Sequence, residues 1–339
     1  MKKILAFALA AMMAVMTGCG SASVSSAPSS ESPASSEPVN EAKQVVIGIV
    51  QPMDHPSLNQ IRETIIDELD VLGLTGAVKI EYRNANGDAS MLPTIMSELI
   101  GGGVDILVPI ATGTAQAAAA ATDTLPIIFS AVSNPVEAGL VTAFEETTSN
   151  ITGVSNSIAI EDIFKLTKEL TPDVKTFGFV YTTSEVNSMA GIKRARAYCD
   201  ANGIPYKEAA ITGVGELQSA AQSLVGQVDA FFTPNDNTIA SAISIYMQVA
   251  NDAGIPVYVG ADSMVADGGL ATVGIDYTVL GRQTAQMIAR ILNGETIAEN
   301  HVEQVKEYAK MINMVTAKQL GITVPDALKD EFVIIKSNS

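Results

Sequence analysis

The sequence predicts an α/β protein built from two doubly wound lobes, each a parallel sheet covered by helices on both faces. Short apolar runs such as residues 106–110 (ILVPI) are followed directly by helical patterns. A strand buried on both faces shows such a continuous run, because helices cover both sides of the sheet. Strand–helix pairs of this kind occur in two consecutive series, and 339 residues are enough for two cores.

Composition excludes several function classes. Hydrophobic residues make up 47% of the chain and charged residues 17%, which is typical of a globular protein. The net charge of −17 argues against nucleic-acid binding and against attraction to anionic lipid. Trp is absent and aromatic residues are scarce, so a stacking platform for bases is not expected. With two Cys and two His, no His/Cys metal site and no cofactor are predicted.

Residues 1–18 are predicted to be a lipoprotein signal peptide. Lys2 and Lys3 form a positively charged start, and residues 4–16 are apolar but too short to span a bilayer. The segment ends in MTGC, which resembles a bacterial lipoprotein box, although Met16 replaces the usual Leu. The resemblance implies cleavage before Cys19 and lipidation of that residue. The alternative is ordinary secretion, with Cys19 as an unmodified thiol.

Residues 19–44 are predicted to be the lipidated Cys and a flexible linker. Residues 20–44 include nine Ser and three Pro, and such a segment cannot bury enough surface to offset the entropy of ordering. A lipid anchor, a linker and a folded body predict a protein held at the extracytoplasmic side of the cell membrane. After cleavage Cys199 is the sole thiol, so no intrachain disulfide is possible, and its helical context predicts a small core residue.

The first series of elements begins at residue 45. Leu58, Ile61 and Ile65 recur at helical spacing. The predicted elements are strands at 45–50, 78–82, 106–110 and 127–129, and helices at 58–72, 91–100, 117–121 and one beginning near Pro135. The glycines at 101–103 are interpreted as a helix stop, because no Gly-Lys-Ser/Thr follows as in a phosphate-binding loop.

A second series follows from residue 151. Its predicted strands are 151–155, 176–181, 206–211, 228–232, 257–260 and 270–275, with helices at 160–170, 188–201, 216–225 and 238–253. A late helix at 279–292 and a final segment at 311–320 would let the chain cross between the lobes three times, near 151–155, near 275–278 and after Asn300. The predicted lobes are therefore 45–152 with 278–305, and 153–277 with 306–339.

Polar residues at the strand ends form the candidate ligand site. Ligands in doubly wound folds bind beyond the carboxyl ends of the strands, where two facing lobes would enclose a cleft. The turn at 112–114 also starts a helix, whose partial positive charge favours an anion such as a carboxylate. The candidate ligand-binding residues are Gln51, Ser57, Thr112, Gly113, Thr114, Ser130, Ala131, Glu185, Asn187, Ser188, Asn235, Asp236, Asn237 and Asp262.

Helix capping competes with ligand binding at several of these positions. Thr112 or Thr114 would be explained by capping of the following helix alone. Asp236 and Asn237 would also serve as caps, although two such residues exceed what one cap requires.

Four polar or aromatic residues would also fit purely structural roles. Glu185 would fit a solvated acid in the first turn of a helix, stabilised by the helix dipole, and Asp262 would fit a surface-loop position. His55 would fit a structural hydrogen bond first, a ligand contact second and a catalytic role last, and Tyr277 would fit interlobe packing or a lid.

A family resemblance extends over residues 45–328. Its motifs, in order, are QPMDHPS (51–57), NANGD (84–88), ATGTAQ (111–116), PIIFSAVSNPVEAGLV (126–141), SEVNS (184–188), PNDNT (234–238), IDYTVLGRQ (275–283) and AKQLGITVP (317–325). In this respect the chain resembles the ABC transporter substrate-binding lipoproteins that include tryptophan- and tyrosine-binding members. The resemblance implies the periplasmic binding protein-like I fold, with a three-segment hinge.

The resemblance implies an amino-acid-like ligand. The turn at 112–114 and the loop Ser130-Ala131 would hold its carboxylate, and Asp236 would meet its ammonium group, since a buried cation needs a carboxylate partner. Glu185, Asn187 and Ser188 would complete the second-lobe wall.

Two departures from the family pattern leave the ligand open. Asn134 precedes Pro135 where Asp is usual, and Asn235 stands where Thr is frequent. No aromatic side-chain pocket is evident, so another amino acid or a small amide-like solute is an alternative.

The predicted function is capture of a small solute by hinge closure and delivery to a membrane permease, by a protein expected to be a monomer. An enzyme is not expected, because no nucleophile elbow, P-loop, dinucleotide fingerprint or metal cluster is present in the sequence. A surface sensor, or a binding protein for a sugar or nucleoside, remains an alternative. A purely structural protein would leave the polar strand ends unexplained.

Overall fold

The computed structural model describes residues 44–147 and 150–336, which belong to one compact unit. The predicted signal peptide at 1–18, the lipidated Cys19 and the linker up to residue 43 lie outside the described residues. Within these ranges, no helix is long and apolar enough to cross a membrane.

The first lobe contains a six-stranded parallel sheet with the order β11-β5-β4-β3-β1-β2. Its strands are β1 (Val45–Gln51), β2 (Val78–Asn84), β3 (Ile106–Pro109), β4 (Ile127–Val132), β5 (Ile151–Ser155) and β11 (Glu303–Gln304). Its helices are α1 (Pro56–Val71), η1 (Ala89–Met91), α2 (Leu92–Gly101), α3 (Thr112–Ala121), α10 (Tyr277–Leu292) and η3 (Ile297–Glu299).

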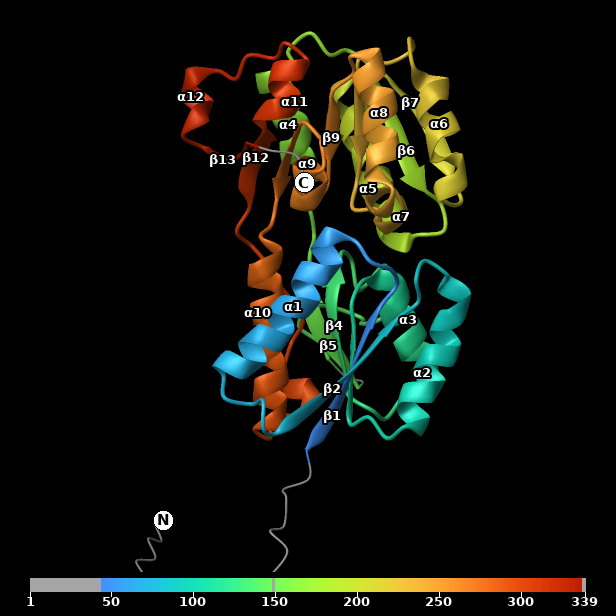
Figure 1. Ribbon diagram of the computed structural model, residues 1–339, viewed down its shortest axis with the longest axis vertical. Coiled ribbons are helices and arrows are strands. Elements are labelled where there is room, and N and C mark those ends of the chain that lie inside the picture. Colours follow the sequence, from blue (N-terminus) through green and yellow to red (C-terminus); the bar gives the residue numbers. More distant parts are fainter. Residues whose placement is uncertain (1–43, 148–149, 337–339) are drawn as a thin grey trace, which may run out of the picture. The chain divides into compact units, whose positions relative to one another are not determined.

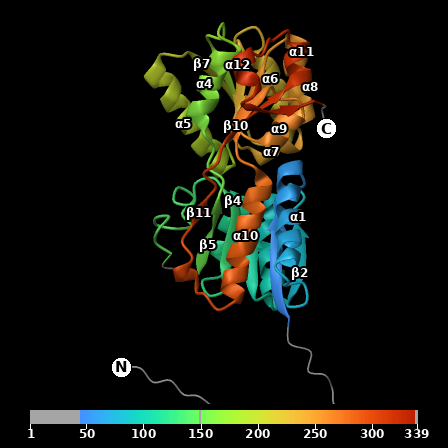
Figure 2. The ribbon, with the colours of Figure 1, turned by 90° about the vertical axis from the view of Figure 1, so that its left-hand side faces the viewer.

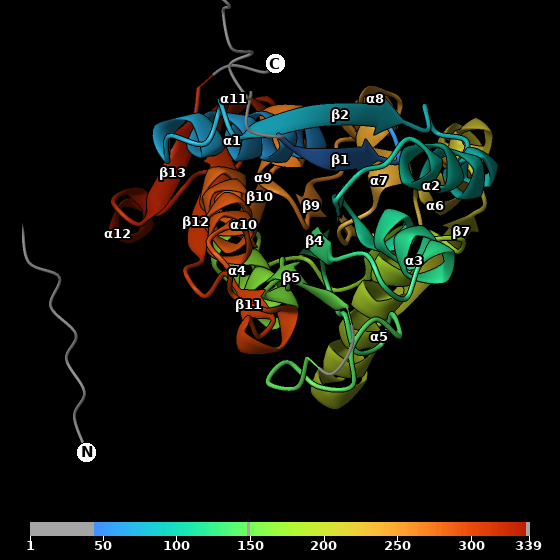
Figure 3. The same ribbon diagram turned by 90° about the horizontal axis from the view of Figure 1, so that it is seen from below.

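Helices cover both faces of this sheet (Figures 1 and 3). Ile47 and Ile49 point to one face and pack in a cluster with apolar residues of α1 and α10, which lie side by side in Figure 2. Val50 and Leu107 point to the other face and pack with α2 and α3. Successive strand side chains point to opposite faces of the sheet, and helices cover both faces. The strands are therefore apolar at successive positions.

The second lobe contains a seven-stranded sheet with the order β13-β12-β10-β9-β8-β6-β7, in which β12 runs antiparallel to β10 and the other pairs are parallel. Its strands are β6 (Phe177–Thr182), β7 (Tyr206–Ile211), β8 (Ala230–Thr233), β9 (Val257–Val259), β10 (Ala271–Gly274), β12 (Ala309–Asn313) and β13 (Phe332–Ile335). Its helices are α4 (Ile160–Leu170), α5 (Val186–Asn202), η2 (Val214–Glu216), α6 (Leu217–Leu224), α7 (Asn237–Ser241), α8 (Ile243–Ala253), α9 (Asp262–Ala266), α11 (Met314–Gln319) and α12 (Asp326–Lys329).

The chain passes between the two sheets three times. It leaves β5 for α4, returns from β10 to α10, and leaves β11 for β12. The predicted α/β fold with two doubly wound lobes and a three-segment hinge is therefore confirmed. The antiparallel pairing of β12 with β10 corrects one expectation, because the sequence predicted two fully parallel sheets.

Other expectations were wrong in detail. The segment after Pro135 forms turns in place of the expected helix, because Gly139 adopts a left-handed φ of 73° after one turn. The helix expected at 238–253 is divided into α7 and α8 at Ala242, whose φ of −127° is not helical. The edge strand β13 and the short helix α9 were not predicted. Cys199 is fully buried, as expected, and burial raises the pKa of its thiol to about 12.

Candidate functional site

The strand ends of the two lobes enclose a narrow cavity, here named the inner cavity. The centre of a water molecule can occupy about 30 Å³ of this cavity. It is lined by His55, Ser57, Leu58, Thr112, Ala131, Ser133, Asn156, Asn187, Asn235, Asp236, Asn237, Ala240, Ala261, Met264 and Tyr277. Residues of both lobes contribute, as the predicted cleft requires.

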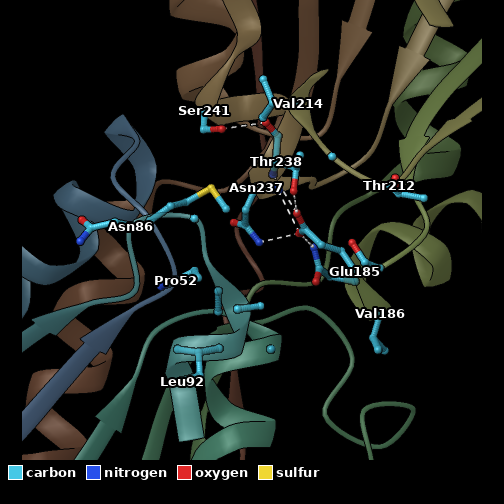
Figure 4. Close-up of a pocket in the computed structure, with 18 of the residues that line it drawn as sticks. Pro52, Asn86, Leu92, Glu185, Val186, Thr212, Val214, Asn237, Thr238 and Ser241 are labelled. Atoms are coloured by element: carbon cyan, nitrogen blue, oxygen red, sulfur yellow. Dashed lines mark hydrogen bonds between the residues drawn. The ribbon is translucent and has the colours of Figure 1, made fainter. Parts of the chain in front are cut away.

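A wider cavity of about 600 Å³, the outer cavity, shares Asn187 and Asn237 with the inner one (Figure 4). Its other lining residues are Pro52, Met53, Asp54, Asn86, Gly87, Ala89, Leu92, Ala111, Gly113, Gln116, Ser184, Glu185, Val186, Thr212, Gly213, Val214, Thr238 and Ser241. Among the described residues, neither cavity is lined by Lys or Arg, while Asp54, Glu185 and Asp236 contribute acidic groups.

The predicted site residues divide into three groups. Those lining the inner cavity are Ser57, Thr112, Ala131, Asn187, Asn235, Asp236 and Asn237. Gly113 and Glu185 line the outer cavity. Gln51, Thr114, Ser130, Ser188 and Asp262 line neither, so the structure does not bring them to a cavity surface.

Gln51, a member of the third group, supports neighbouring residues. Gln51 donates to the carbonyl of Met53 (3.1 Å) and to Asn59 (2.9 Å), and its oxygen accepts from Arg62 (2.9 Å). Gln51 is fully buried. Its hydrogen bonds therefore hold the loop that leads into α1.

Two other residues of the third group occupy buried surroundings. The Ser130 hydroxyl lies 2.8 Å from that of Thr284 on α10. The Asp262 carboxylate accepts from the Ser263 backbone N–H (2.7 Å), and burial raises the pKa of Asp262 to about 6. Asp262 is thus not a freely exposed loop residue.

Strained backbone marks the ends of β3 and β4. Ala111 and Ala131 have φ angles of 76° and 60°, in the left-handed region that alanine rarely adopts. Such conformations cost about 1–3 kcal/mol and persist where the surroundings enforce them, often at binding sites. The Ala111 N–H donates to the carbonyl of Ser130 (2.9 Å), which joins the two turns. The first turn of α3 follows, and the buried hydroxyl of Thr112 has no hydrogen-bond partner.

Asp236 is held in a dense hydrogen-bond network. Its Oδ1 accepts from the Thr182 hydroxyl (2.8 Å) and the Ile239 N–H (2.9 Å), and its Oδ2 accepts from the Thr182 N–H (2.7 Å) and the Ser188 hydroxyl (2.6 Å). Asp236 therefore does cap a helix, α7, in addition to lining the cavity. Burial, with the nearby charge of Glu185, raises the pKa of Asp236 to about 7, although these hydrogen bonds act to lower it.

Glu185 binds the start of α7 from outside the helix (Figure 4). Its Oε1 accepts from the N–H (2.8 Å) and hydroxyl (2.7 Å) of Thr238. Its Oε2 accepts from the N–H (3.0 Å) and side-chain amide (2.7 Å) of Asn237 and from the amide of Asn187 (2.9 Å). In the described part of the chain, neither Glu185 nor Asp236 forms an ion pair, so two close carboxylates lie beside the cavities without a cation.

Asn235 presents an unpartnered amide to the inner cavity. Both its Oδ1 and its Nδ2 are buried, and within the described part of the chain neither meets a partner in good hydrogen-bond geometry. Its position is tightly defined, because a Cβ on Gly260 would lie 2.6 Å from the Asn235 backbone nitrogen and 2.8 Å from its Oδ1. The Asn187 amide also donates to the backbone carbonyl of Asn235 (2.9 Å). Nearby, burial raises the pKa of the Tyr277 hydroxyl, which lies close to the amides of Asn156 and Asn235.

Polar contacts between described residues cross the cleft. The hydroxyls of Ser57 and Ser263 lie 2.5 Å apart, and His55 Nε2 lies 3.1 Å from Asn237 Oδ1. Another contact is an ion pair of 2.6 Å between Lys193 and Glu137.

Sequence reasoning missed part of the lining. Asn156 and Met264 reach the inner cavity from the first crossing segment and from α9. Asn86, Thr212 and Val214 reach the outer cavity from the ends of β2 and β7. The strand-end rule applied to these two edge strands would have found them, and Asn86 also lies within the NANGD motif.

Comparisons with known proteins agree with this architecture. Residues 46–332 match the family described as ABC transporter substrate binding protein. A tyrosine-binding protein of Clostridioides difficile (strain R20291) is 35% identical, over 99% of this chain and 97% of that protein.

Two solved structures are also similar. An ABC domain from Streptococcus pneumoniae in complex with L-Trp is 36% identical, with a TM-score of 0.84, over 87% of this chain and 100% of that one. A ligand-free, open substrate-binding protein with adhesive properties from Clostridium difficile is 33% identical, with a TM-score of 0.67, over 86% and 99%. The match to the family model and the sequence identity to these relatives agree with the two-lobed architecture. This chain therefore belongs to the family of ABC transporter substrate-binding proteins.

Proposed function

We propose that the protein captures an amino acid in the inner cavity by closure of its lobes and delivers it to a membrane permease. The observation that carries this proposal is the set of buried polar atoms around the cavity that lack partners: Thr112 Oγ1, His55 Nδ1 and the Asn235 amide. Buried polar groups are nearly always hydrogen-bonded, and an unmade bond costs about 1–3 kcal/mol. A bound solute with complementary groups would remove that cost.

The ligand carboxylate would lie at the start of α3. The helix presents N–H groups without intrahelical partners and a partial positive charge. The unpartnered Thr112 hydroxyl adds a donor at the same place. Ser130 and Ala131 would form the adjoining wall, in which Ala131 lines the cavity.

The ligand ammonium would lie toward the second lobe. The carboxyl groups of Asp236 and Glu185 lie close together, and among the described residues neither has a cationic partner. Burial and the charge of Glu185 raise the pKa of Asp236. A cation bound beside the two carboxyl groups would favour their ionised forms. Because the Asp236 oxygens already accept four hydrogen bonds, its contribution would be the charge more than a direct contact. Glu185, Asn187 and Ser188 would fix the surrounding wall.

The ligand side chain would lie between apolar walls. Leu58, Ala240 and Met264 line the inner cavity, which favours a largely apolar group. At about 30 Å³ the cavity must widen to admit one. The names of the relatives, tyrosine-binding protein and complex with L-Trp, support an aromatic amino acid.

Comparison of TM-scores supports the closure mechanism. The two neighbours have similar identity to this chain, but the L-Trp complex scores 0.84 and the open, ligand-free protein 0.67. The lobes here are therefore arranged more like those of the liganded neighbour. Ligand contacts from both lobes would favour this closed state over an open one.

We also propose that Cys19 anchors a monomeric protein to the extracytoplasmic side of the membrane. This proposal rests on the MTGC motif and the Ser-rich linker.

Thermal unfolding of residues 41–339 in the presence of the twenty amino acids, sugars and nucleosides tests the ligand class. A ligand that binds the folded state raises Tm as its concentration rises. We expect tyrosine or tryptophan to do so, and Asn235→Leu to weaken the effect. A shift with a sugar or nucleoside and none with any amino acid would contradict the proposal.

A further inference from the structure

We propose that His55 Nδ1 accepts a hydrogen bond from the ligand ammonium, and that Glu185 fixes the imidazole tautomer that makes this possible. The inference rests on the proposed function and assigns a ligand contact to His55, for which the sequence favoured a structural hydrogen bond and placed ligand contact second. It follows from a chain of hydrogen bonds that runs from Glu185 through Asn237 to His55.

The orientation of the Asn237 amide is fixed at its Nδ2 end. Nδ2 lies 2.7 Å from Glu185 Oε2, and an ionised carboxylate only accepts hydrogen bonds. The NH₂ group of Asn237 must therefore face Glu185. Its Oδ1 consequently faces His55 Nε2, at 3.1 Å.

This orientation determines the tautomer of His55. An amide oxygen cannot donate, so His55 Nε2 must carry the proton of this hydrogen bond. Burial lowers the pKa of His55, and opposing effects come from the hydrogen bond to Asn237 and from the carboxylates of Glu185 and Asp54. In the neutral ring with a proton on Nε2, Nδ1 is an acceptor.

Nδ1 is an acceptor without a partner. The atom is buried, and His55 as a whole is 7% exposed and lines the inner cavity. His55 occupies the N-cap position of α1, but its side chain caps no backbone N–H there. An ammonium brings three donors, and the nearby Asp236 oxygens are already occupied, so His55 supplies the free lone pair that this group needs.

This chain of hydrogen bonds crosses the cleft between the lobes. His55 belongs to the first lobe, whereas Asn237 and Glu185 belong to the second. The tautomer is therefore imposed when the lobes meet, and the ammonium acceptor is completed by closure. Protonation of His55 would place a donor and a positive charge beside the ammonium, so acid should oppose binding.

Nitrogen NMR of the histidine rings tests the tautomer in the ligand-free protein and again with an amino acid bound, because the contact of His55 with Asn237 requires the lobes to meet. The chain has two His, and His301 is exposed and serves as an internal reference. We expect the His55 ring to be neutral with its proton on Nε2, and Glu185→Gln to lose this preference because Gln can donate to Asn237. A wild-type ring protonated on Nδ1 would overturn the inference.

Ligands with and without an ammonium group test the contact between this group and His55. L-Tyrosine and L-tryptophan are compared with 3-(4-hydroxyphenyl)propionate and 3-indolepropionate, which lack the ammonium, by calorimetry on the wild type and His55→Phe. We expect His55→Phe to weaken amino-acid binding roughly tenfold to a hundredfold and to change binding of the deaminated acids far less. An equal loss for both classes would show a structural role alone and overturn the inference.

Ser57→Ala is the matched control, because Ser57 also starts α1 and bonds across the cleft. It should weaken both ligand classes equally. The wild-type affinity for the amino acids should fall below about pH 6.5, the ordinary pKa of His. The fall should be shallower in His55→Phe, in which only Asp236, whose pKa is raised to about 7, still titrates in the cavity in this range, and an unchanged fall would contradict the contact. If no amino acid binds the wild type, the proposed function fails, whereas the NMR result still decides the tautomer.

Discussion

Ser57 and Ser263 share a hydrogen bond of 2.5 Å between their hydroxyl oxygens, which links the start of α1 in one lobe to α9 in the other. The link involves no charge, so salt should leave it largely unaffected. It is therefore a contact whose contribution to closure can be separated from that of the Lys193–Glu137 ion pair.

We expect Ser263→Ala to shift the ligand-free protein toward an open arrangement. Loss of one hydrogen bond costs about 0.5–1.5 kcal/mol, which corresponds to roughly a two- to twelvefold change in the open–closed ratio. Energy transfer between dyes on the two lobes would measure this ratio. Lys193→Ala serves as the salt-dependent comparison, since exposed pairs contribute less and are screened. An unchanged ratio in Ser263→Ala would mean that the bond does not stabilise closure.

Asp236→Ala should destabilise the protein as well as weaken ligand binding. The change removes the cap of α7, takes away the acceptor of the Ile239 N–H and of the Thr182 hydroxyl, and leaves the Thr182 N–H with only its longer contact to the Ser188 hydroxyl (3.3 Å). A loss of about 2 kcal/mol or more in the free energy of unfolding is expected, measured by urea denaturation. Asp262→Ala is the control and should cost less, because the Asp262 carboxylate accepts from local backbone N–H groups such as that of Ser263 and not from a second element. Equal stability of the two variants would contradict the role of the Asp236 network.

Stability should also depend on pH through Asp262. Its folded pKa of about 6 lies above the ordinary value near 3.9, so the folded state holds this proton more tightly. The resulting stabilisation is present below about pH 4 and is lost as pH rises through about 6, by roughly 1–3 kcal/mol. Asp262→Asn should flatten this part of the ligand-free stability profile. His55 affects stability in the opposite direction near pH 6.5: because burial lowers its pKa, its effect is to reduce stability as pH falls. His55→Phe therefore provides the second comparison.

Cys19→Ala should release the protein from the membrane. Without the Cys19 thiol no lipid can be attached at this position. Fractionation of cells and medium, with incorporation of a labelled fatty acid, measures the change. Cys199→Ala is the control, since that thiol is fully buried and its pKa is raised. Membrane retention of Cys19→Ala would exclude the lipid anchor.

The strand-end rule predicted much of the inner cavity from sequence. Ser57, Thr112 and Asp236 follow buried strands, and parallel strands bring such residues to a common edge. The rule does not say which side chains are already engaged, so Gln51 and Ser188 were grouped with residues that line the cavity. Their partners depend on side-chain positions that no periodicity encodes.

The role of His55 was beyond sequence reasoning for the same reason. Its hydrogen-bond state depends on Asn237 and Glu185, which lie 182 and 130 positions away in the chain. The direction of β12 was also not predictable from local pattern, because it depends on the chain entering the second sheet from the last crossing. Local alternation identifies a strand, but its neighbour in the sheet is a property of the whole chain.

Neither sheet is built from a continuous segment, and this affects how the protein is made. The first lobe lacks α10 and β11 until residue 304 is available, and the second lacks β12 and β13 until about residue 335. A chain emerging from the ribosome or crossing a membrane therefore cannot finish either lobe early. Incomplete sheets leave strand edges and apolar faces exposed, which favours aggregation. Protection of the nascent chain until its last tenth has been synthesised is thus a requirement of the three-crossing topology.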